Sequence, residues 1–174
     1  MSVRIRPARA DEAAMLRELA HRSKAHWPYP ADFLAAVRPL LQLDATDIAR
    51  DSVGVMEDGD QLIGWHRVQA RATHAELEDL WLEPAWIGHG LGRTLFEHAV
   101  AIARAGGATA LEWDAEPFAE GFYAAMGGVV IDQVPSAVVE GRLLPRMRLE
   151  LGEAGQPSRR STRPNRPYGG RGSA

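Results

Sequence analysis

The amino-acid sequence predicts a single domain of mixed α/β class, in which strands and helices alternate along the chain. The length of 174 residues suits one hydrophobic core, and 45% of the residues are hydrophobic. Stretches of alternating apolar and polar residues are interspersed with stretches in which apolar residues recur every three or four positions. The absence of cysteine excludes disulfide scaffolds, thiolate metal sites and cysteine nucleophiles.

The first part of the chain predicts one strand and two helices. Residues 3–6 alternate apolar and polar side chains, which is typical of a strand. Asp11 is a suitable N-cap for a helix whose apolar stripe covers residues 14–20. The prolines within residues 28–30 end that helix, and the apolar spacing of residues 31–43 predicts a second one.

The middle of the chain predicts a hairpin and a further strand. Residues 52–56 and 62–69 read as two strands, and the dipeptide Asp58-Gly59 between them is a turn signal. Residues 75–82 predict the next strand.

The second half contains the clearest predicted helix, residues 88–105, whose apolar side chains lie on one face. Gly106 and Gly107 are suitable residues to end it. The remaining predicted elements are strands at 110–113, 129–134 and 147–151 and a helix at 118–126.

The charge is unevenly distributed between a domain and a tail. Residues 152–174 hold five arginines, one glutamate and almost no apolar side chains, so we expect a disordered tail after a domain spanning residues 1–151. The domain then holds 15 basic and 22 acidic residues, which argues against a nucleic-acid partner and favours cationic ligands. No apolar run suits a membrane span or a signal peptide, so we expect a cytoplasmic protein without a membrane partner.

A glycine-rich loop follows the strand at 75–82 and leads directly into the long helix. Gly88, Gly90 and Gly92 let the backbone approach a phosphate group, which the free N–H groups of the first helical turn can bind. The Walker A pattern is absent, and the dinucleotide-binding fingerprint would need a glycine where Arg93 stands. Glycines that merely allow close packing of helix and strand are the alternative explanation.

The spacing Pro-x-x-x-Gly-x-Gly-x-Gly before a helix, followed later by Phe122-Tyr123 and Met126-Gly127, resembles the GNAT superfamily of acetyl-CoA-dependent N-acetyltransferases. The resemblance covers residues 1–151. It implies the GNAT fold, in which helices flank a central, mostly antiparallel twisted sheet. It also implies acetyl-CoA as co-substrate and a homodimer as one state that the family commonly adopts.

The resemblance assigns the family's site residues to positions of this chain. The pyrophosphate loop falls on Gly88, His89, Gly90, Leu91, Gly92 and Arg93. The strand whose backbone meets the pantetheine and the thioester falls on Leu80, Trp81 and Leu82. Tyr123 matches the tyrosine that protonates the departing thiolate. Two positions differ from the family pattern: Ile87 replaces a Gln or Arg of the loop, and Glu116 replaces an Asn that contacts the pantetheine.

Acetyl transfer to an amine needs a neutral nucleophile and therefore a proton acceptor. An amine with a pKa of about 10.4 is protonated at neutral pH, and a general base raises the rate by roughly 10²–10⁴. Glu76 and Glu78 are the candidates, because alternation places them on one strand face and Asp79 on the other. Some family members carry their base at the position of Glu76. Exposed strand charges are the alternative explanation for both glutamates, and the sequence does not separate them.

Aromatic and charged residues outline an acceptor pocket. The resemblance places His26, Trp27 and Tyr29 at the acceptor site, where an aromatic wall near carboxylates suits an amine. Asp114, at the end of a predicted strand, could anchor an ammonium group. Arg142 could instead bind an acceptor carboxylate, with plain surface exposure as the alternative.

The six histidines show no metal-ligand spacing, and Gly-x-Ser-x-Gly is absent, so we expect neither a metal site nor a serine hydrolase triad. Our hypothesis is an N-acetyltransferase that moves the acetyl group of acetyl-CoA directly to a primary amine, most simply that of a small molecule. The alternative is a binding module that retains the CoA pocket as a sensor or assembly partner without turnover. The changes at Ile87 and Glu116 favour that alternative, whereas Tyr123 and the strand carboxylates count against it.

Overall fold

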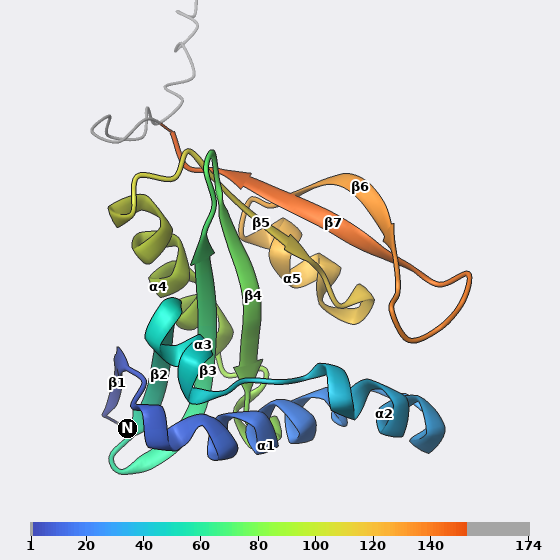
Figure 1. Cartoon of the computed structure of the whole chain (residues 1–174), viewed down its shortest axis with the longest axis horizontal. Coiled ribbons are helices and arrows are strands. Elements are labelled where there is room, and N and C mark those ends of the chain that lie inside the picture. Colours follow the sequence, from blue (N-terminus) through green and yellow to red (C-terminus); the bar gives the residue numbers. More distant parts are fainter. Residues whose placement is uncertain (1, 153–174) are drawn as a thin grey trace, which may run out of the picture.

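The computed structural model describes residues 2–152, which form a seven-stranded sheet flanked by helices (Figure 1). The strands are β1 Val3–Pro7, β2 Ser52–Asp58, β3 Gln61–Ala70, β4 Ala75–Leu82, β5 Ala110–Asp114, β6 Val129–Pro135 and β7 Leu143–Glu150. The α-helices are α1 Ala13–Lys24, α2 Ala31–Val37, α3 Ala45–Arg50, α4 Leu91–Ala105 and α5 Glu120–Ala125. The predicted mixed α/β class is confirmed. The predicted disordered tail lies, beyond Gly152, outside the described residues.

The sheet has the order β1-β2-β3-β4-β5-β7-β6, and every neighbouring pair is antiparallel except β4 and β5. Helix α4 makes the crossover that these two parallel strands need. They pair only where Ala75 meets Leu111 and where Glu76 meets Glu112. Beyond Glu76 the two strands diverge like the arms of a V (Figure 1). The edge of β4 that faces β5 therefore has no strand partner over residues 77–82.

A β-bulge lies in β4 where the divergence begins. In the register between β3 and β4, Arg67 pairs with Asp79 but its neighbour Val68 pairs with Leu77, so Glu78 has no opposite residue. The bulge interrupts the alternation of side chains along the strand. The prediction that Asp79 points away from the face of Glu78 is therefore wrong, because both carboxylates approach the Arg67 guanidinium, at 2.9 Å and 4.0 Å.

The core lies on both faces of the sheet. On one face α4 packs Leu95, Phe96 and Ala99, each at most 1% exposed, against the strands. On the other face Leu16 of α1 contacts Trp65 of β3, whose indole N–H also donates to the Leu16 carbonyl at 2.9 Å. Both helices are thereby fixed against the two sides of β3 and β4, which determines where the loop before α4 and the end of α1 lie.

Two helices differ from the prediction at their ends. The helix predicted over 31–43 stops as an α-helix at Val37 and continues as a short 3-10 turn. The separate helix α3 is not predicted by the apolar pattern, and it begins at Asp44, whose carboxylate accepts a hydrogen bond from the N–H of Asp47 at 2.8 Å. Within residues 2–152 no helix is both long and apolar enough to cross a membrane.

The start of α1 also differs from the prediction. Asp11 does not cap it, because Asp11 lies inside a 3-10 turn that precedes the helix, with an exposed side chain. Glu12 is the N-cap residue of α1, but its side chain accepts no hydrogen bond from that helix. Its carboxylate instead accepts one from the backbone N–H of Arg9 at 2.7 Å, which caps the 3-10 turn. Glu12 is also bound by Arg6 of β1, which ties the helix start to the sheet edge.

Candidate active site

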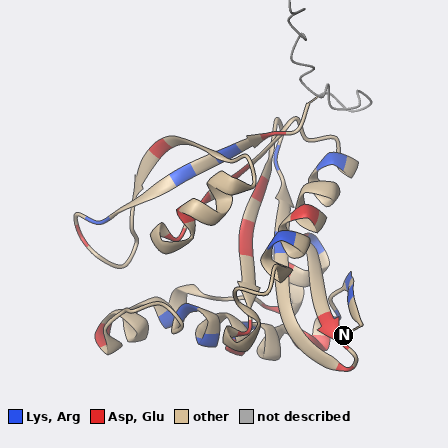
Figure 2. Ribbon diagram, turned by 180° about the vertical axis from the view of Figure 1, so that it is seen from behind, with Lys and Arg blue, Asp and Glu red and all other residues tan. Residues whose placement is uncertain are grey.

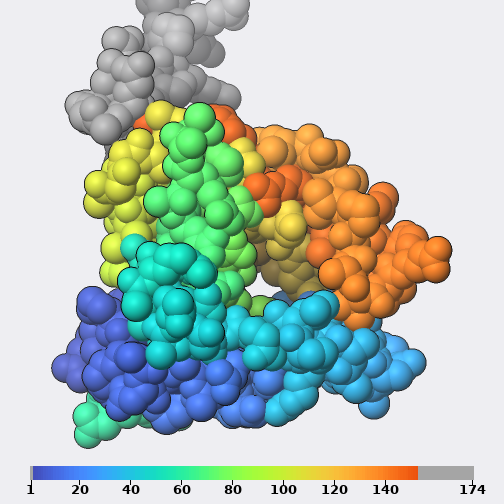
Figure 3. Space-filling model, viewed as in Figure 1, coloured from blue at the N-terminus to red at the C-terminus, as the bar shows by residue number. Residues whose placement is uncertain are grey.

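A cleft opens where β4 and β5 diverge. Its volume is about 490 Å³, and its walls come from β4, the glycine loop, the first turn of α4, the end of β5 and the segment leading into α5. Ser23 and Trp27, at the end of α1, close the opposite side. The space-filling view shows a hollow between β4, α5 and the α1–α2 region (Figure 3). The volume is typical of a small-molecule site, so this cleft is the candidate active site.

The three glycines of the loop have two different roles. Gly88 and Gly90 have φ values of +87° and +81°, which disfavour residues with a side chain, and a Cβ at either would have no heavy atom within 4 Å. Gly92 instead lies under Phe122, whose ring would be 3.4 Å from its Cβ. Close packing therefore explains Gly92, whereas it explains neither Gly88 nor Gly90, which border open space at the start of α4.

The start of α4 is arranged to bind an anion. Gly90 is the N-cap, and the N–H groups of Leu91 and Gly92 have no partner among the described residues, whereas the N–H of Arg93 donates to the Gly90 carbonyl at 3.2 Å. Two N–H groups and the positive end of the helix dipole therefore remain available. Seven predicted cofactor residues other than Glu116 line the cleft: Leu80, Trp81, Leu82, Gly88, Gly90, Gly92 and Arg93. Two do not. Leu91 is buried in the core, and His89 is exposed with its ring 3.2 Å from the Ile87 carbonyl.

Tyr123 lies on α5 and faces the cleft from a closely packed aromatic cluster. Its ring centroid is 5.0 Å from that of Trp113 and 5.6 Å from that of Phe96, and only 8% of the residue is exposed. Burial raises the pKa of the Tyr123 phenol above its ordinary value, and the carboxylates of Glu116 and Asp79 add to the rise. The phenol therefore keeps its proton at neutral pH.

Glu116, the departure from the family pattern, lines the cleft and joins three separate segments. Its carboxylate is bound by Lys24 from α1 and by the Tyr29 hydroxyl, and the guanidinium of Arg142, from the β6–β7 loop, lies 3.7 Å away. Lys24 and Arg142 also lie over the Tyr29 ring, at 5.0 Å and 5.1 Å from its centroid. Burial, with the neighbouring Glu116, raises the pKa of Tyr29. The negative charge of Glu116 is thus compensated by Lys24 and Arg142. Because these residues belong to α1 and to the β6–β7 loop, Glu116 also links that loop to α1.

The two candidate bases are in different places. Glu78 lines the cleft, and its carboxylate lies 3.0 Å from the exposed Arg71. Glu76 does not line the cleft, and the Arg146 guanidinium binds both of its carboxylate oxygens. Glu112 shares Arg146 with it. The two carboxylates therefore belong to an ion-pair network on the sheet.

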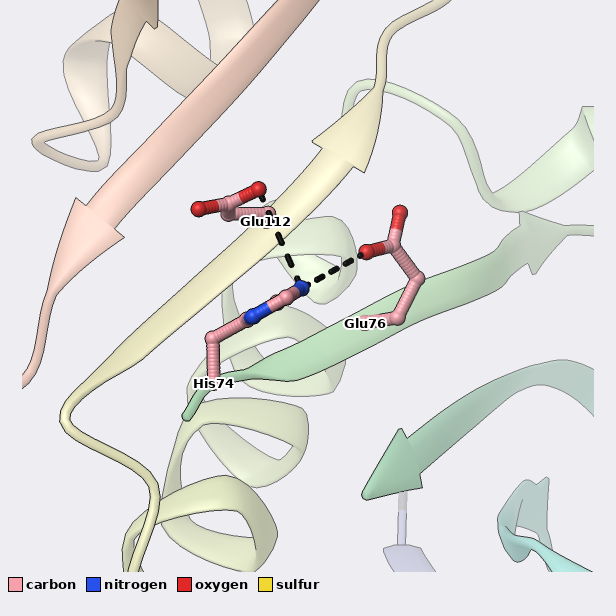
Figure 4. Close-up of side chains that lie close together, drawn as sticks. All are labelled: His74, Glu76 and Glu112. Atoms are coloured by element: carbon pink, nitrogen blue, oxygen red, sulfur yellow. Dashed lines mark ion pairs between the residues drawn. The ribbon is translucent and has the colours of Figure 1, made fainter. Parts of the chain in front are cut away.

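His74 completes a cluster with Glu76 and Glu112, in which one ligand atom from each residue lies within 4.8 Å of the others (Figure 4). Its Nε2 is 3.5 Å from Glu76 and 3.9 Å from Glu112. Metal ions favour these residue types. Arg146 already binds both carboxylates, however, so the ion-pair network accounts for the cluster without a metal.

Asp79 is a cleft residue that sequence reasoning misplaced. Burial raises the pKa of its carboxyl to about 6, although Arg67 and a hydrogen bond from the Trp81 indole N–H at 2.8 Å oppose the rise. The clue in the sequence is weak: two adjacent acids, Glu78 and Asp79, interrupt the alternation of apolar and polar residues along the strand.

Two of the five predicted acceptor residues lie at the cleft. Trp27 and Asp114 line the cleft, whereas His26, Tyr29 and Arg142 do not. His26 packs edge-on against Trp27, with their centroids 5.3 Å apart. Two further lining residues, Ser23 and Phe118, were not predicted, because each reads as an ordinary helix residue in the sequence.

The model of the family described as Acetyltransferase (GNAT) matches residues 14–127. The chain belongs to the GNAT family of acetyltransferases. This confirms the family that the glycine spacing and Tyr123 predicted, and it makes the protein an acyltransferase by family. No curated protein matches the chain significantly.

Solved structures of GNAT proteins share the fold at low sequence identity. The PaiA N-acetyltransferase of Thermoplasma acidophilum, in complex with coenzyme A, is 22% identical with a TM-score of 0.71, over 86% of this chain and 99% of that one. YncA of Salmonella typhimurium, a putative acetyltransferase with acetyl-CoA, is 22% identical with a TM-score of 0.64, over 91% and 99%. The ribosomal-protein-S18-alanine N-acetyltransferase of Escherichia coli is 18% identical with a TM-score of 0.65, over 89% and 97%.

Proposed function

We propose that this GNAT protein transfers the acetyl group of acetyl-CoA directly to a primary amine of a small molecule. The observation that carries the proposal is the cleft between β4 and β5. The unpaired edge of β4 forms one wall of the cleft, the glycine loop and the start of α4, which no side chain caps, form another, and Tyr123 also lines it. Amine-acetylating enzymes among the structural neighbours agree with it.

The residues fit acetyl-CoA. Gly88 and Gly90 leave open space at the positive end of α4, where a pyrophosphate would meet backbone N–H groups and Arg93. The unpaired edge of β4 over residues 77–82 offers backbone donors and acceptors to the pantetheine amides, as an added strand would. The aliphatic Ile87 removes one polar partner, but the contacts that remain are mainly backbone contacts.

Acetyl-CoA supplies the acetyl group as a reactive thioester, and the chain supplies the proton transfers. The acceptor ammonium gives a proton to Glu78, directly or through a water, and the neutral nitrogen forms its bond to the carbonyl carbon as the carbon–sulfur bond breaks. Tyr123 then gives its phenol proton to the departing sulfur, and the resulting phenolate takes the second proton of the amine nitrogen, directly or through a water, so that a neutral amide and the CoA thiol are released. A backbone N–H near Leu82, on the open edge, donates to the carbonyl oxygen while it carries negative charge.

Glu78 is a better base than Glu76 on geometric grounds. Glu78 lines the cleft, where its carboxylate can meet the amine, and its contacts with the half-exposed Arg71 at 3.0 Å and with Arg67 at 4.0 Å are looser than the paired contacts of Glu76. Both oxygens of Glu76 are occupied by Arg146 outside the cleft. Asp79 is less suitable because its oxygens face Trp81 and Arg67.

The test is a Tyr123→Phe variant assayed with acetyl-CoA and a panel of primary amines. We expect kcat to fall by about 10²-fold because the proton donor is lost, while the Kd of acetyl-CoA, measured calorimetrically on the same variant, stays unchanged. Tight acetyl-CoA binding by the wild-type protein without CoA release on any amine would contradict an enzyme and favour the sensor.

A further inference from the structure

One end of the cleft has an exposed aromatic surface. We call the residues Trp27, Glu78, Asp114, Glu116 and Phe118 the acceptor end; they line the cleft and belong neither to the glycine loop nor to α4. Within it, Trp27 and Phe118 stack with their centroids 5.4 Å apart and their planes 12° from parallel. Phe118 is 50% exposed although it adjoins a cavity. An exposed phenyl ring beside a cavity offers apolar contact area to a ligand.

The charged side chains of the acceptor end are all acidic. Glu78 belongs to β4, the strand in the middle of Figure 2, Asp114 is the last residue of β5, and Glu116 lies in the segment after β5. Among the described residues that line the cleft, Arg93 is the only basic residue, and it lies in the first turn of α4, next to the glycine loop. A negatively charged group on the acceptor would therefore meet carboxylates and no free cation.

The cations within 4.0 Å of the three acids of the acceptor end are already paired and do not line the cleft. Arg71 and Arg67 lie 3.0 Å and 4.0 Å from Glu78, and Arg67 is also 2.9 Å from Asp79. Lys24 and Arg142 both bind Glu116. Arg146 lies 3.1 Å from Asp114 and also binds two other carboxylates. The expectation that Arg142 anchors an acceptor carboxylate is therefore not supported, because its guanidinium is engaged with Glu116 and the Tyr29 hydroxyl.

Asp114 retains capacity to bind an ammonium group. Its side chain is 47% exposed, and Arg146 contacts only its Oδ1 atom. Its other oxygen, Oδ2, receives no hydrogen bond from the described residues, so it can accept one from a ligand.

We infer that the acceptor is a primary amine cation on an aromatic skeleton that carries no carboxylate. The inference rests on the proposed function and assigns its substrate class. The ammonium group lies near Asp114, and the ring packs on Trp27 and Phe118, where contact between a cation and an aromatic face adds to the attraction. Amino acids are rejected because their carboxylate would face the acids of the acceptor end.

The test compares kcat/KM for pairs of amines that differ in one feature. Phenethylamine against phenylalanine isolates the carboxylate, and phenethylamine against butylamine isolates the ring. We expect phenethylamine to exceed phenylalanine by at least about 100-fold and butylamine by at least about 10-fold. In Asp114→Asn the first ratio should shrink at least fivefold, and in Phe118→Ala the second should approach one. Asp132→Asn, the same change on the exposed edge strand β6, should alter neither ratio.

The outcomes distinguish a wrong substrate class from a wrong function. Equal or faster turnover of phenylalanine, or of butylamine, overturns the substrate class but leaves acetyl transfer standing. If Asp114→Asn and Phe118→Ala leave the two kcat/KM ratios unchanged, the assignment of these residues is overturned. If the protein binds acetyl-CoA yet acetylates none of the three amines, the substrate class is overturned. The wider amine panel then decides whether the proposed function falls with it.

Discussion

Gly90 and Gly107 form a matched pair for testing the phosphate loop. They lie at the two ends of α4 with φ values of +81° and +82°, and a Cβ on either would meet no heavy atom within 4 Å. Substitution by alanine therefore costs only the backbone strain of the left-handed conformation, about 1–2 kcal/mol at each position. For a domain of this size we expect each variant to melt about 2–8 °C below the wild type.

The two variants should differ in their affinity for acetyl-CoA. The added methyl group at Gly90 occupies the space where the pyrophosphate lies, so we expect the Kd of Gly90→Ala to rise at least about tenfold, which is 1.4 kcal/mol. Gly107→Ala should bind as the wild type does. Calorimetric titration beside thermal melts measures both quantities. Wild-type affinity in Gly90→Ala, or equal losses in the two variants, would refute the role of the loop.

Three further predictions follow from buried or paired charges. His66 is fully buried, 2.7 Å from His98, and burial, with a smaller effect of His98, lowers its pKa to about 3 from 6.5. The unfolded chain therefore binds the extra proton below pH 6.5, so stability is lost as the pH falls, by about 2 kcal/mol at pH 5. Urea titrations should show this loss greatly reduced in His66→Gln. Glu116→Ala leaves the partly buried cations Lys24 and Arg142 without this partner and should lower the free energy of unfolding by about 2–3 kcal/mol, less than the loss of a fully buried ion pair costs. Amide exchange at residues 136–142 should become faster, and unchanged exchange there would argue against the anchoring of the β6–β7 loop. Glu78→Gln should lower kcat by at least about 100-fold, whereas Glu76→Gln should keep kcat, and the reverse order would restore Glu76 as the base.

The sequence predicted the elements of the fold well, because side-chain periodicity reports which face of each segment is buried. The long helix α4 followed from that pattern, and the mostly antiparallel sheet followed from the family resemblance. The bulge at Glu78 could not be predicted, because it is a property of the register between Arg67 and Asp79 on neighbouring strands. Helix α3 was missed because its stability depends on the Asp44 capping box rather than on an apolar stripe.

The candidate site was predictable where local backbone chemistry determines it. Glycines before a helix predict an anion loop, and Gly88 and Gly90 have the positive φ values that make glycine favourable there. The partners of the charged residues were not predictable. Lys24 and Glu116 are 92 residues apart in sequence, and only the folded chain shows that their ion pair, with Arg142, neutralises a charge that seemed to oppose cofactor binding.

A calorimetric titration of acetyl-CoA into the wild-type 174-residue protein, with ATP and dephospho-CoA as comparison ligands, shows directly whether the cleft binds the cofactor. The cleft between β4 and β5 predicts one acetyl-CoA per chain, bound with a Kd on the order of micromolar, and markedly weaker binding of ATP, which lacks a pantetheine to occupy the open edge of β4. Absence of binding heat for acetyl-CoA at several temperatures, or equally tight binding of ATP, would contradict the account.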